Sequence, residues 1–409
     1  MTTTRIGDNI ANIWVITGTK YGTLGATSFF DFNNLTGNAG IDNFSLNGGN
    51  ITGTVDGAGG VNSISADNTY NTWTVVSLDA GNVTGISAFL NIENLNGNAG
   101  TDNFIFSDVS SISGVVDGFG SVDIVNQSAQ SGFVNLTLGS SGFNNIESFI
   151  GNGGNSTLTG ENIVNTWNIT GVDSGTVGPI SFSNISNLQG GSSDDSFTTN
   201  GGSVTGSIDG GSGNDLILAE NVVNTWNITG ANTGNVNNIS SFSGIESLQG
   251  NADIDNYVFA DGSSFVGVIN GAGGADLVDI SSETGAVNIS LATNQFQNIE
   301  SFSGNNVTST LIGENTINTW SVTGSNSGTV NTTNFSGFNN LTGNSSADTF
   351  ALAGGNITGT IDGGTGNDTI QAENITNTWT VTSSDTGNLT KVNAFQNIEN
   401  LLGGSAIDI

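Results

Sequence analysis

The chain contains no cysteine, no histidine, one proline and only three basic residues among its 409. Without cysteine, neither a disulfide framework nor a thiolate metal site can form. The three basic residues, Arg5, Lys20 and Lys391, are too few and too scattered to neutralise phosphate groups, which argues against nucleic acid and anionic membranes as partners. No apolar run reaches the roughly 18 residues of a membrane span, so none is predicted.

Acidic residues and glycine are abundant instead. The net charge is -32, from 35 acidic and three basic residues, which makes cations the expected partners. Glycine accounts for 62 residues, and the apolar fraction is 35%. That fraction is low for a globular domain, but it suits a thin solenoid with a narrow core.

The tryptophans reveal an internal repeat. Their spacings alternate between 59 and 94 residues, so the full repeat is 153 residues long, and no insertion or deletion breaks its register. We therefore treat residues 1–409 as one continuous domain of tandem units. The units start near Trp14, Trp73, Trp167, Trp226, Trp320 and Trp379.

Short apolar groups that alternate with polar residues fill each unit, and clusters of Gly, Asn, Asp and Ser separate them. This pattern predicts strands and turns, and signals for helices are almost absent. Asp348 recurs as Asp368, and Asp255 recurs as Asp276, at a shorter and nearly constant spacing. That spacing predicts an all-β fold, a right-handed parallel β-solenoid (β-helix or β-roll-like) with rungs of about 20 residues. About 21 rungs at ~4.8 Å each would form a rod of roughly 100 Å.

Two stretches carry a specific motif. Gly210–Leu218 and Gly363–Gln371 both fit the nonapeptide G-G-x-G-x-D-x-U-x. The chain thus resembles the haemolysin-type (RTX-like) calcium-binding repeat proteins. It also resembles giant repetitive bacterial surface proteins and adhesins, in which F-x-N-I-E-N-L segments alternate with D-G-G-x-G-N-D segments. The resemblance implies bound calcium and an extracellular or cell-surface location. Other turns depart from the motif, and Asn62 replaces the aspartate in one of them.

Aspartates of these motifs are the candidate metal ligands. A twenty-residue rung would place Asp195 beneath Asp215 and Asp348 beneath Asp368. Two unpaired carboxylates about 5 Å apart repel by roughly 3 kcal/mol at an effective dielectric of 20, and bound Ca²⁺ would remove that cost. The alternative is that Asp and Asn simply suit turns. The complete candidate set is Asp195, Asp215, Asp348, Asp368, Asp209 and Asp362.

Two further residue types have competing interpretations. The tryptophans could stack on sugars, but each shares a strand face with an apolar residue two positions later, which favours a place in the core. Five glutamates recur in I-E-N or I-E-S segments, and could be catalytic acids or a row that is solvated or binds turns. We favour the second interpretation. These glutamates are Glu93, Glu147, Glu246, Glu300 and Glu399.

The expected function is structural rather than enzymatic, because no cluster of reactive side chains interrupts the repeat. We expect a segment of an extracellular repetitive bacterial protein, such as an adhesin stalk or a surface fibre, stiffened by calcium. The alternative is a carbohydrate- or surface-binding adhesive module, with cell-surface glycans as partners. The chain begins and stops inside the repeat, so flanking repeats, or copies of itself end to end, are the other expected partners.

Overall fold

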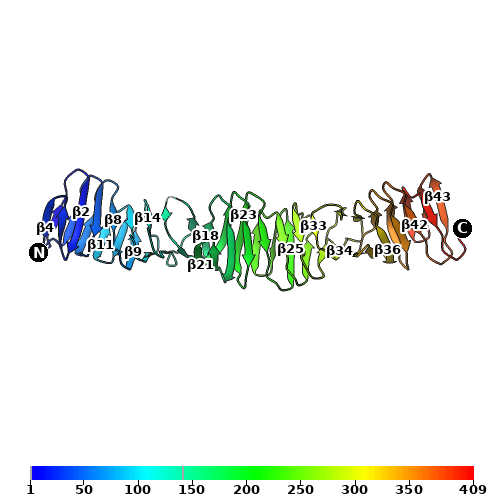
Figure 1. The fold of residues 1–409 in the computed structure, drawn as a ribbon, viewed down its shortest axis with the longest axis horizontal. Helices are drawn as coiled ribbons and strands as arrows, with labels where there is room; N and C mark the ends of the chain where they lie inside the picture. Colours follow the sequence, from blue (N-terminus) through cyan, green and yellow to red (C-terminus); the bar gives the residue numbers. More distant parts are fainter. Residues whose placement is uncertain (1, 141) are drawn as a thin grey trace. The chain divides into compact units, whose positions relative to one another are not determined.

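The computed structural model describes residues 2–140 and 142–409. Throughout these residues the backbone forms strands and turns without a helix, which confirms the all-β prediction (Figure 1). It follows that no helix in the described part could cross a membrane. The chain divides into two compact units, Met1–Gly213 and Asn214–Ile409, and each is described by itself.

Parallel ladders of short strands build the first unit. The strands direct apolar residues inward, and these residues align from strand to strand, as Trp14 does with Phe44 and Phe44 with Ile64. One ladder contains β2 (Asn12–Gly18), β6 (Asp42–Leu46), β8 (Ser63–Ser65), β12 (Asn94–Asn96), β14 (Val116–Asp117) and β17 (Phe143–Asn144). Another contains β9 (Asn71–Ser77), β13 (Asp102–Phe106), β15 (Ile124–Asn126) and β18 (Ser148–Thr159).

The second unit repeats this arrangement. Trp226 aligns with Tyr257 and Val278, and Trp320 aligns with Phe350 and then Ile370. One ladder contains β25 (Asn224–Gly230), β29 (Asp255–Phe259), β31 (Leu277–Asp279) and β34 (Ser301–Ser303). Another contains β36 (Thr319–Gly324), β40 (Thr349–Leu352), β42 (Thr369–Gln371) and β46 (Asn400–Leu402).

Antiparallel hairpins interrupt the parallel ladders, which the sequence did not lead us to expect. Each tryptophan strand is followed by two short antiparallel strands, as in β2, β3 (Tyr21–Leu24) and β4 (Thr27–Phe30). In unit 2, β25, β26 (Thr233–Val236) and β27 (Ile239–Ser243) form the same hairpin. Because the hairpin lies between paired strands, Asn12 aligns with Asp42, a much longer step than the predicted rung. The predicted rung length therefore holds only where no extra segment intervenes, as between Phe350 and Ile370.

Five of the tryptophans lie at the centre of the core. Trp14, Trp73, Trp167, Trp226 and Trp320 are fully buried. Each stacks on an aromatic ring of the next parallel strand, as Trp226 does on Tyr257 with ring centroids 5.5 Å apart. The core prediction is confirmed for these five, and they are not available as sugar platforms. Trp379 differs, because it is half-buried and Val381, on the same strand, is 61% exposed.

Candidate functional site

The candidate site lies in the turns that lead into the ladder strands, which we call corners. In the two motifs and their relatives, a glycine precedes an Asp, Asn or Ser by five residues, and the polar side chain folds back over that glycine. A Cβ atom on Gly97 would lie 2.3 Å from Asp102 Oδ2, and one on Gly343 would lie 2.4 Å from Asp348 Oδ2. Only glycine leaves room for the carboxylate, so the spacing is required by packing.

These polar side chains form ladders of hydrogen bonds along the corners. The backbone N–H of Asp102 donates to Asp123 Oδ1 over 2.7 Å, and the N–H of Asp123 donates to Glu147 Oε2 over 2.9 Å. In unit 2 the same pattern runs from Asp255 to Asp276, over 2.7 Å, and on to Glu300. Each carboxylate thus satisfies a buried backbone donor of the preceding strand.

Asparagine stands at one end of a ladder and glutamate at the other. Asn318 donates both its backbone N–H and its Nδ2 to Asp348 Oδ1, over 2.6 and 2.9 Å. All five recurrent glutamates accept a backbone N–H, so the turn-binding interpretation is confirmed. The donors are Asn62 for Glu93, Asp123 for Glu147, Asp215 for Glu246, Asp276 for Glu300 and Asp368 for Glu399.

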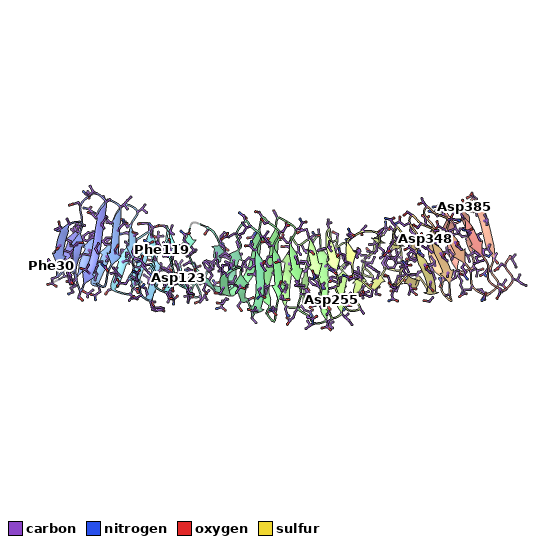
Figure 2. All side chains as sticks on the ribbon, in the orientation of Figure 1. Phe30, Phe119, Asp123, Asp255, Asp348 and Asp385 are labelled. Atoms are coloured by element: carbon purple, nitrogen blue, oxygen red, sulfur yellow. The ribbon has the colours of Figure 1, made fainter. Side chains whose placement is uncertain are left out.

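Two of the predicted metal ligands lie together within one ladder. The N–H of Asp348 donates to Asp368 Oδ1 over 2.7 Å, and both side chains are buried. The Oδ2 atom of each carboxylate is buried and has no hydrogen-bond partner within the described residues. Asp348 and the related Asp123 and Asp255 can be located in Figure 2. The pair therefore presents two buried carboxylate oxygens that nothing in the described part of the chain neutralises.

Asp362 lies outside this pair and has partners of its own. Its carboxylate accepts hydrogen bonds from the backbone N–H of Gly364, from Gln396 Nε2 and from Asn397 Nδ2, over 3.0, 2.8 and 2.7 Å. Those three donors tie the glycine turn to the next strand. The structure thus places Asp362 as a turn-binding residue, and its oxygens are already used.

The other candidate aspartates are divided between the two units. Asp195 Oδ1 accepts from the N–H and the Nδ2 of Asn165, over 2.6 and 2.8 Å, and Asp209 Oδ1 accepts from Gly211 over 3.2 Å. Asp215 belongs to the second unit, where its N–H donates to Glu246 Oε2. Because Asp195 and Asp215 fall in different units, their predicted stacking stays a prediction.

Burial weakens the acidity of the ladder carboxyl groups. It raises the pKa of Asp102 to about 7, and that of Asp123, Asp276 and Asp368 to about 6. Neighbouring charges add to the effect of burial, as Asp255 and Glu300 do at Asp276. Burial also raises the pKa of Asp348. A buried carboxylate without a cation nearby favours its neutral form.

The ladder that contains Asn62 shows the hydrogen bond that the aspartates lack, which is one to the second atom of the side-chain head group. Asn62 Oδ1 accepts the N–H of Asp42 over 3.0 Å, and its Nδ2 donates to the carbonyl oxygen of Asn91 over 3.1 Å. Asp123 holds the same position in the next ladder. A Cβ atom on Gly118 would lie 2.4 Å from both Asp123 Oδ2 and the Asn145 carbonyl oxygen, so these two acceptors lie close together. Such a carboxyl group needs a proton or a cation to satisfy its second oxygen.

Sequence reasoning found the aspartates and glutamates but not the hydrogen bonds that join them. The recurrent spacing of five residues from glycine to Asp, Asn or Ser was the signal that could have revealed the ladders. Within the described residues, no three acidic side chains gather into a cluster that could hold a metal ion. A cation at Asp348 and Asp368 would therefore need carbonyl oxygens as its further ligands.

Comparison with known proteins found no matching family, no matching curated protein and no matching solved structure. The functional argument consequently depends on the residues and their geometry.

Proposed function

We propose that this chain is a structural segment of an extracellular repetitive bacterial protein, such as an adhesin stalk or a surface fibre, and that its parallel ladders form a β-solenoid. The observation that supports the proposal most strongly is the use of the conspicuous polar residues. Aspartates, asparagines and glutamates that could have served chemistry instead bind backbone donors of neighbouring strands, and the bond from Asp102 to Asp123 recurs in the next copy from Asp255 to Asp276. The recurrent polar side chains of this chain therefore hold successive strands together.

Repetition suits a mechanical role. Each strand in a ladder contacts mainly its neighbours, so the stability of a solenoid is approximately a sum of strand and interface contributions. Adding units lengthens the structure without requiring a new core. The stacked aromatic residues and the corner ladders recur every 153 residues, which keeps each interface nearly identical to the last.

Force spectroscopy of the full chain, held at its two ends, tests the structural role. A segment that bears force should resist extension and then unfold in discrete steps, because whole groups of strands lose their packing together. Smooth lengthening at low force would contradict the proposal. The variant Trp226→Ala supplies an internal control, because it should lower the unfolding force of one group of strands only.

We further propose that Ca²⁺ stiffens the corner at Asp348 and Asp368. The two buried Oδ2 atoms without partners are hard oxygen ligands, which Ca²⁺ prefers. A cation there would supply the positive charge that the carboxylates otherwise obtain from protons. The oxygens of Asp362 are engaged by Gln396 and Asn397, so we assign that residue to holding the turn.

Melting curves with Ca²⁺, with Mg²⁺ and with chelator test the calcium proposal. Ca²⁺ should raise the melting temperature more than Mg²⁺, which requires tight octahedral geometry. The double variant Asp348→Asn, Asp368→Asn should abolish most of the rise. Asp255→Asn with Asp276→Asn is the matched control, because that pair has the same 2.7 Å contact but lacks the full nonapeptide. If both double variants lose the calcium-induced rise in melting temperature to the same extent, the nonapeptide motif does not select calcium.

A further inference from the structure

A pocket of about 340 Å³ opens in the first unit, among residues of the region from β13 to β17. Its walls come from the segment after β13, from the loop between β15 and β16 (Val134–Thr137), and from β17. The volume lies at the lower end of the roughly 300–1,000 Å³ typical of small-molecule sites. None of the lining residues that the structure describes carries a charge.

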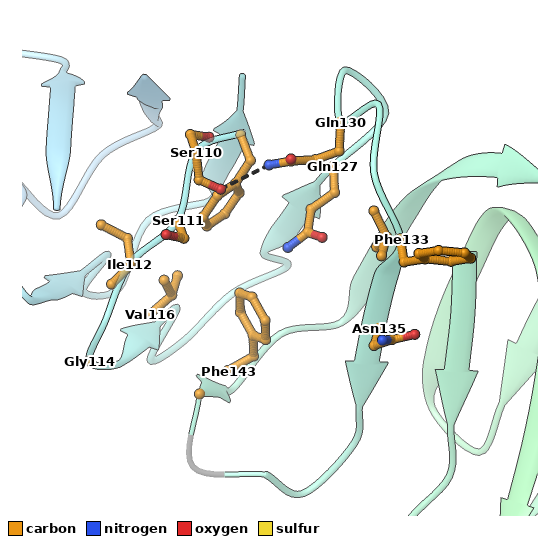
Figure 3. A pocket seen from close by; sticks show the side chains of 13 residues that line it. Ser110, Ser111, Ile112, Gly114, Val116, Gln127, Gln130, Phe133, Asn135 and Phe143 are labelled. Carbon is orange, nitrogen blue, oxygen red and sulfur yellow. Dashed lines mark hydrogen bonds between the residues drawn. The ribbon is translucent and has the colours of Figure 1, made fainter. Parts of the chain in front are cut away.

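The pocket combines an apolar wall with polar side chains, and the Gln127 amide is one that no described neighbour engages. Ile112 and Phe143, which are half-buried, provide the accessible apolar surface, and the buried Phe106 and Val116 lie beneath it. Figure 3 shows the Gln127 amide pointing toward the Phe143 ring, while the Gln130 amide is turned to the Ser110 carbonyl oxygen, 2.9 Å away. Among the described residues, none forms a hydrogen bond with the Gln127 amide, which leaves it free for a ligand.

The second copy of the repeat shows that the pocket is not required by the fold. At the position of Ile112 it has Phe265, and at the position of Gln127 it has Ile280, and both are buried. The Gln295 amide donates to the Phe265 carbonyl oxygen over 2.8 Å and fixes that segment. The same architecture therefore tolerates larger apolar residues at these two positions, and the first copy leaves the space open.

The lining favours a neutral ligand that has both apolar and polar parts. The net charge of -32 and the absence of basic residues from the described lining disfavour an anion, and no lining carboxylate is present to hold a cation. A purely apolar ligand would leave the Gln127 amide without a partner. A ligand with one apolar face and hydroxyl groups at its edge satisfies both walls, and a pyranose ring has this form.

We propose that this pocket binds one neutral pyranose residue, with its apolar face on Phe143 and Ile112 and a hydroxyl group on the Gln127 amide. The site is independent of the structural role, which needs no ligand here. It would add adhesion to a segment that otherwise only spans distance. Phe133 also lines the pocket, but its ring is 86% exposed and extends away from Gln127 and Phe143 in Figure 3, so the proposal assigns it no contact with the sugar.

Saturation-transfer NMR on the full chain with a panel of methyl pyranosides tests the proposal. The panel contains the methyl glycosides of glucose, galactose, mannose and N-acetylglucosamine, and cyclohexanol serves as the apolar comparison. At least one glycoside should receive saturation and bind with a dissociation constant on the order of 1 mM, more tightly than cyclohexanol. No transfer to any glycoside, or tighter binding of cyclohexanol, would overturn the proposal.

Substitutions that introduce the residues of the second copy test whether the sugar binds in this pocket. Ile112→Phe fills the pocket and Gln127→Ile removes its free amide, so each should weaken binding by about tenfold or more. Circular dichroism and melting curves check that both variants fold, and if Ile112→Phe does not, Gln127→Ile alone decides. Phe119→Ala is the control and should bind as the original chain does, because Phe119 is an exposed phenylalanine of the same unit that does not line this pocket. Unchanged binding in Gln127→Ile, or loss of binding in Phe119→Ala, would contradict this site.

Discussion

Replacing Asp123 by asparagine should stabilise the protein at neutral pH, although the change removes a recurrent ladder residue. The backbone N–H of Asp102 would keep its acceptor, because Asn Oδ1 takes the place of Asp Oδ1. The new Nδ2 would stand where Asp123 Oδ2 now lies close to the Asn145 carbonyl oxygen. Asn62 already makes this contact in the preceding ladder, donating to Asn91 over 3.1 Å. The variant thus exchanges a buried oxygen without a partner for a donor with one.

The magnitude follows from that exchange. A buried polar group without a partner costs about 1–3 kcal/mol, and a neutral hydrogen bond contributes about 0.5–1.5 kcal/mol. We therefore expect Asp123→Asn to raise the free energy of unfolding by about 1–3 kcal/mol at pH 8, measured with chelator present.

The gain should depend on pH in a defined direction. Burial, together with the charges of Glu147 and Asp117, raises the pKa of Asp123 from 3.8 to about 6 in the folded protein. A group with a raised pKa contributes stability that is complete below the unfolded pKa, near pH 4, and is lost as the pH rises through about 6. The advantage of asparagine should therefore be small at pH 4.5 and largest above pH 7.

Urea unfolding at pH 4.5 and pH 8, followed by tryptophan fluorescence, measures the effect. Trp73 reports locally, because its Nε1 lies 3.3 Å from Asp102 Oδ1. Asn62→Asp is the reverse control and should destabilise the protein at pH 8 but not at pH 4.5. A less stable Asp123→Asn variant at pH 8, or an effect of equal size at both pH values, would refute the reasoning.

Three further changes probe other contacts. Trp226→Ala should lower the free energy of unfolding by roughly 3–5 kcal/mol, because the ring is fully buried against Tyr257, and a loss below about 1 kcal/mol in urea unfolding would contradict the core assignment. Gly97→Ala should lower the melting temperature, because the new Cβ would lie 2.3 Å from Asp102 Oδ2. Gly154→Ala is the control for an added methyl group, because no atom lies within 4 Å of the new Cβ and the backbone there does not have a positive φ. Glu300→Ala should destabilise the protein by about 1–3 kcal/mol by leaving the N–H of Asp276 without its acceptor, and unchanged urea unfolding would contradict the ladder.

The features that were predicted correctly are those that depend on short stretches of sequence. The all-β class and the burial of Trp226 with Ile228 follow from alternation over a few residues, and the structure confirms both. The hairpins were missed, although Asp173, Asn232 and Asn326 occupy their turns with positive φ, which Asp and Asn adopt more readily than most residues. The predicted rung length comes from pairs such as Asp348 and Asp368, between which no hairpin intervenes.

The candidate site could be predicted only in part, because its hydrogen bonds join residues far apart in the chain. Asp276 and Glu300 are 24 residues apart, and nothing near either of them indicates the bond between them. The use of Asp362 by Gln396 and Asn397, which belong to a later strand and its turn, was equally hidden. The pocket beside Gln127 is lined by Ile112 where the second copy has the larger Phe265, a difference that is visible only when the two copies are compared.

Small-angle X-ray scattering of the full chain in dilute solution, with Ca²⁺ and with chelator, tests the central claim most directly. A structural segment built as a β-solenoid predicts the scattering of a rod of uniform cross-section, retained in both solutions and stiffer with Ca²⁺. The scattering of a compact globular particle, or of a flexible chain of unconnected folded pieces, would contradict the account.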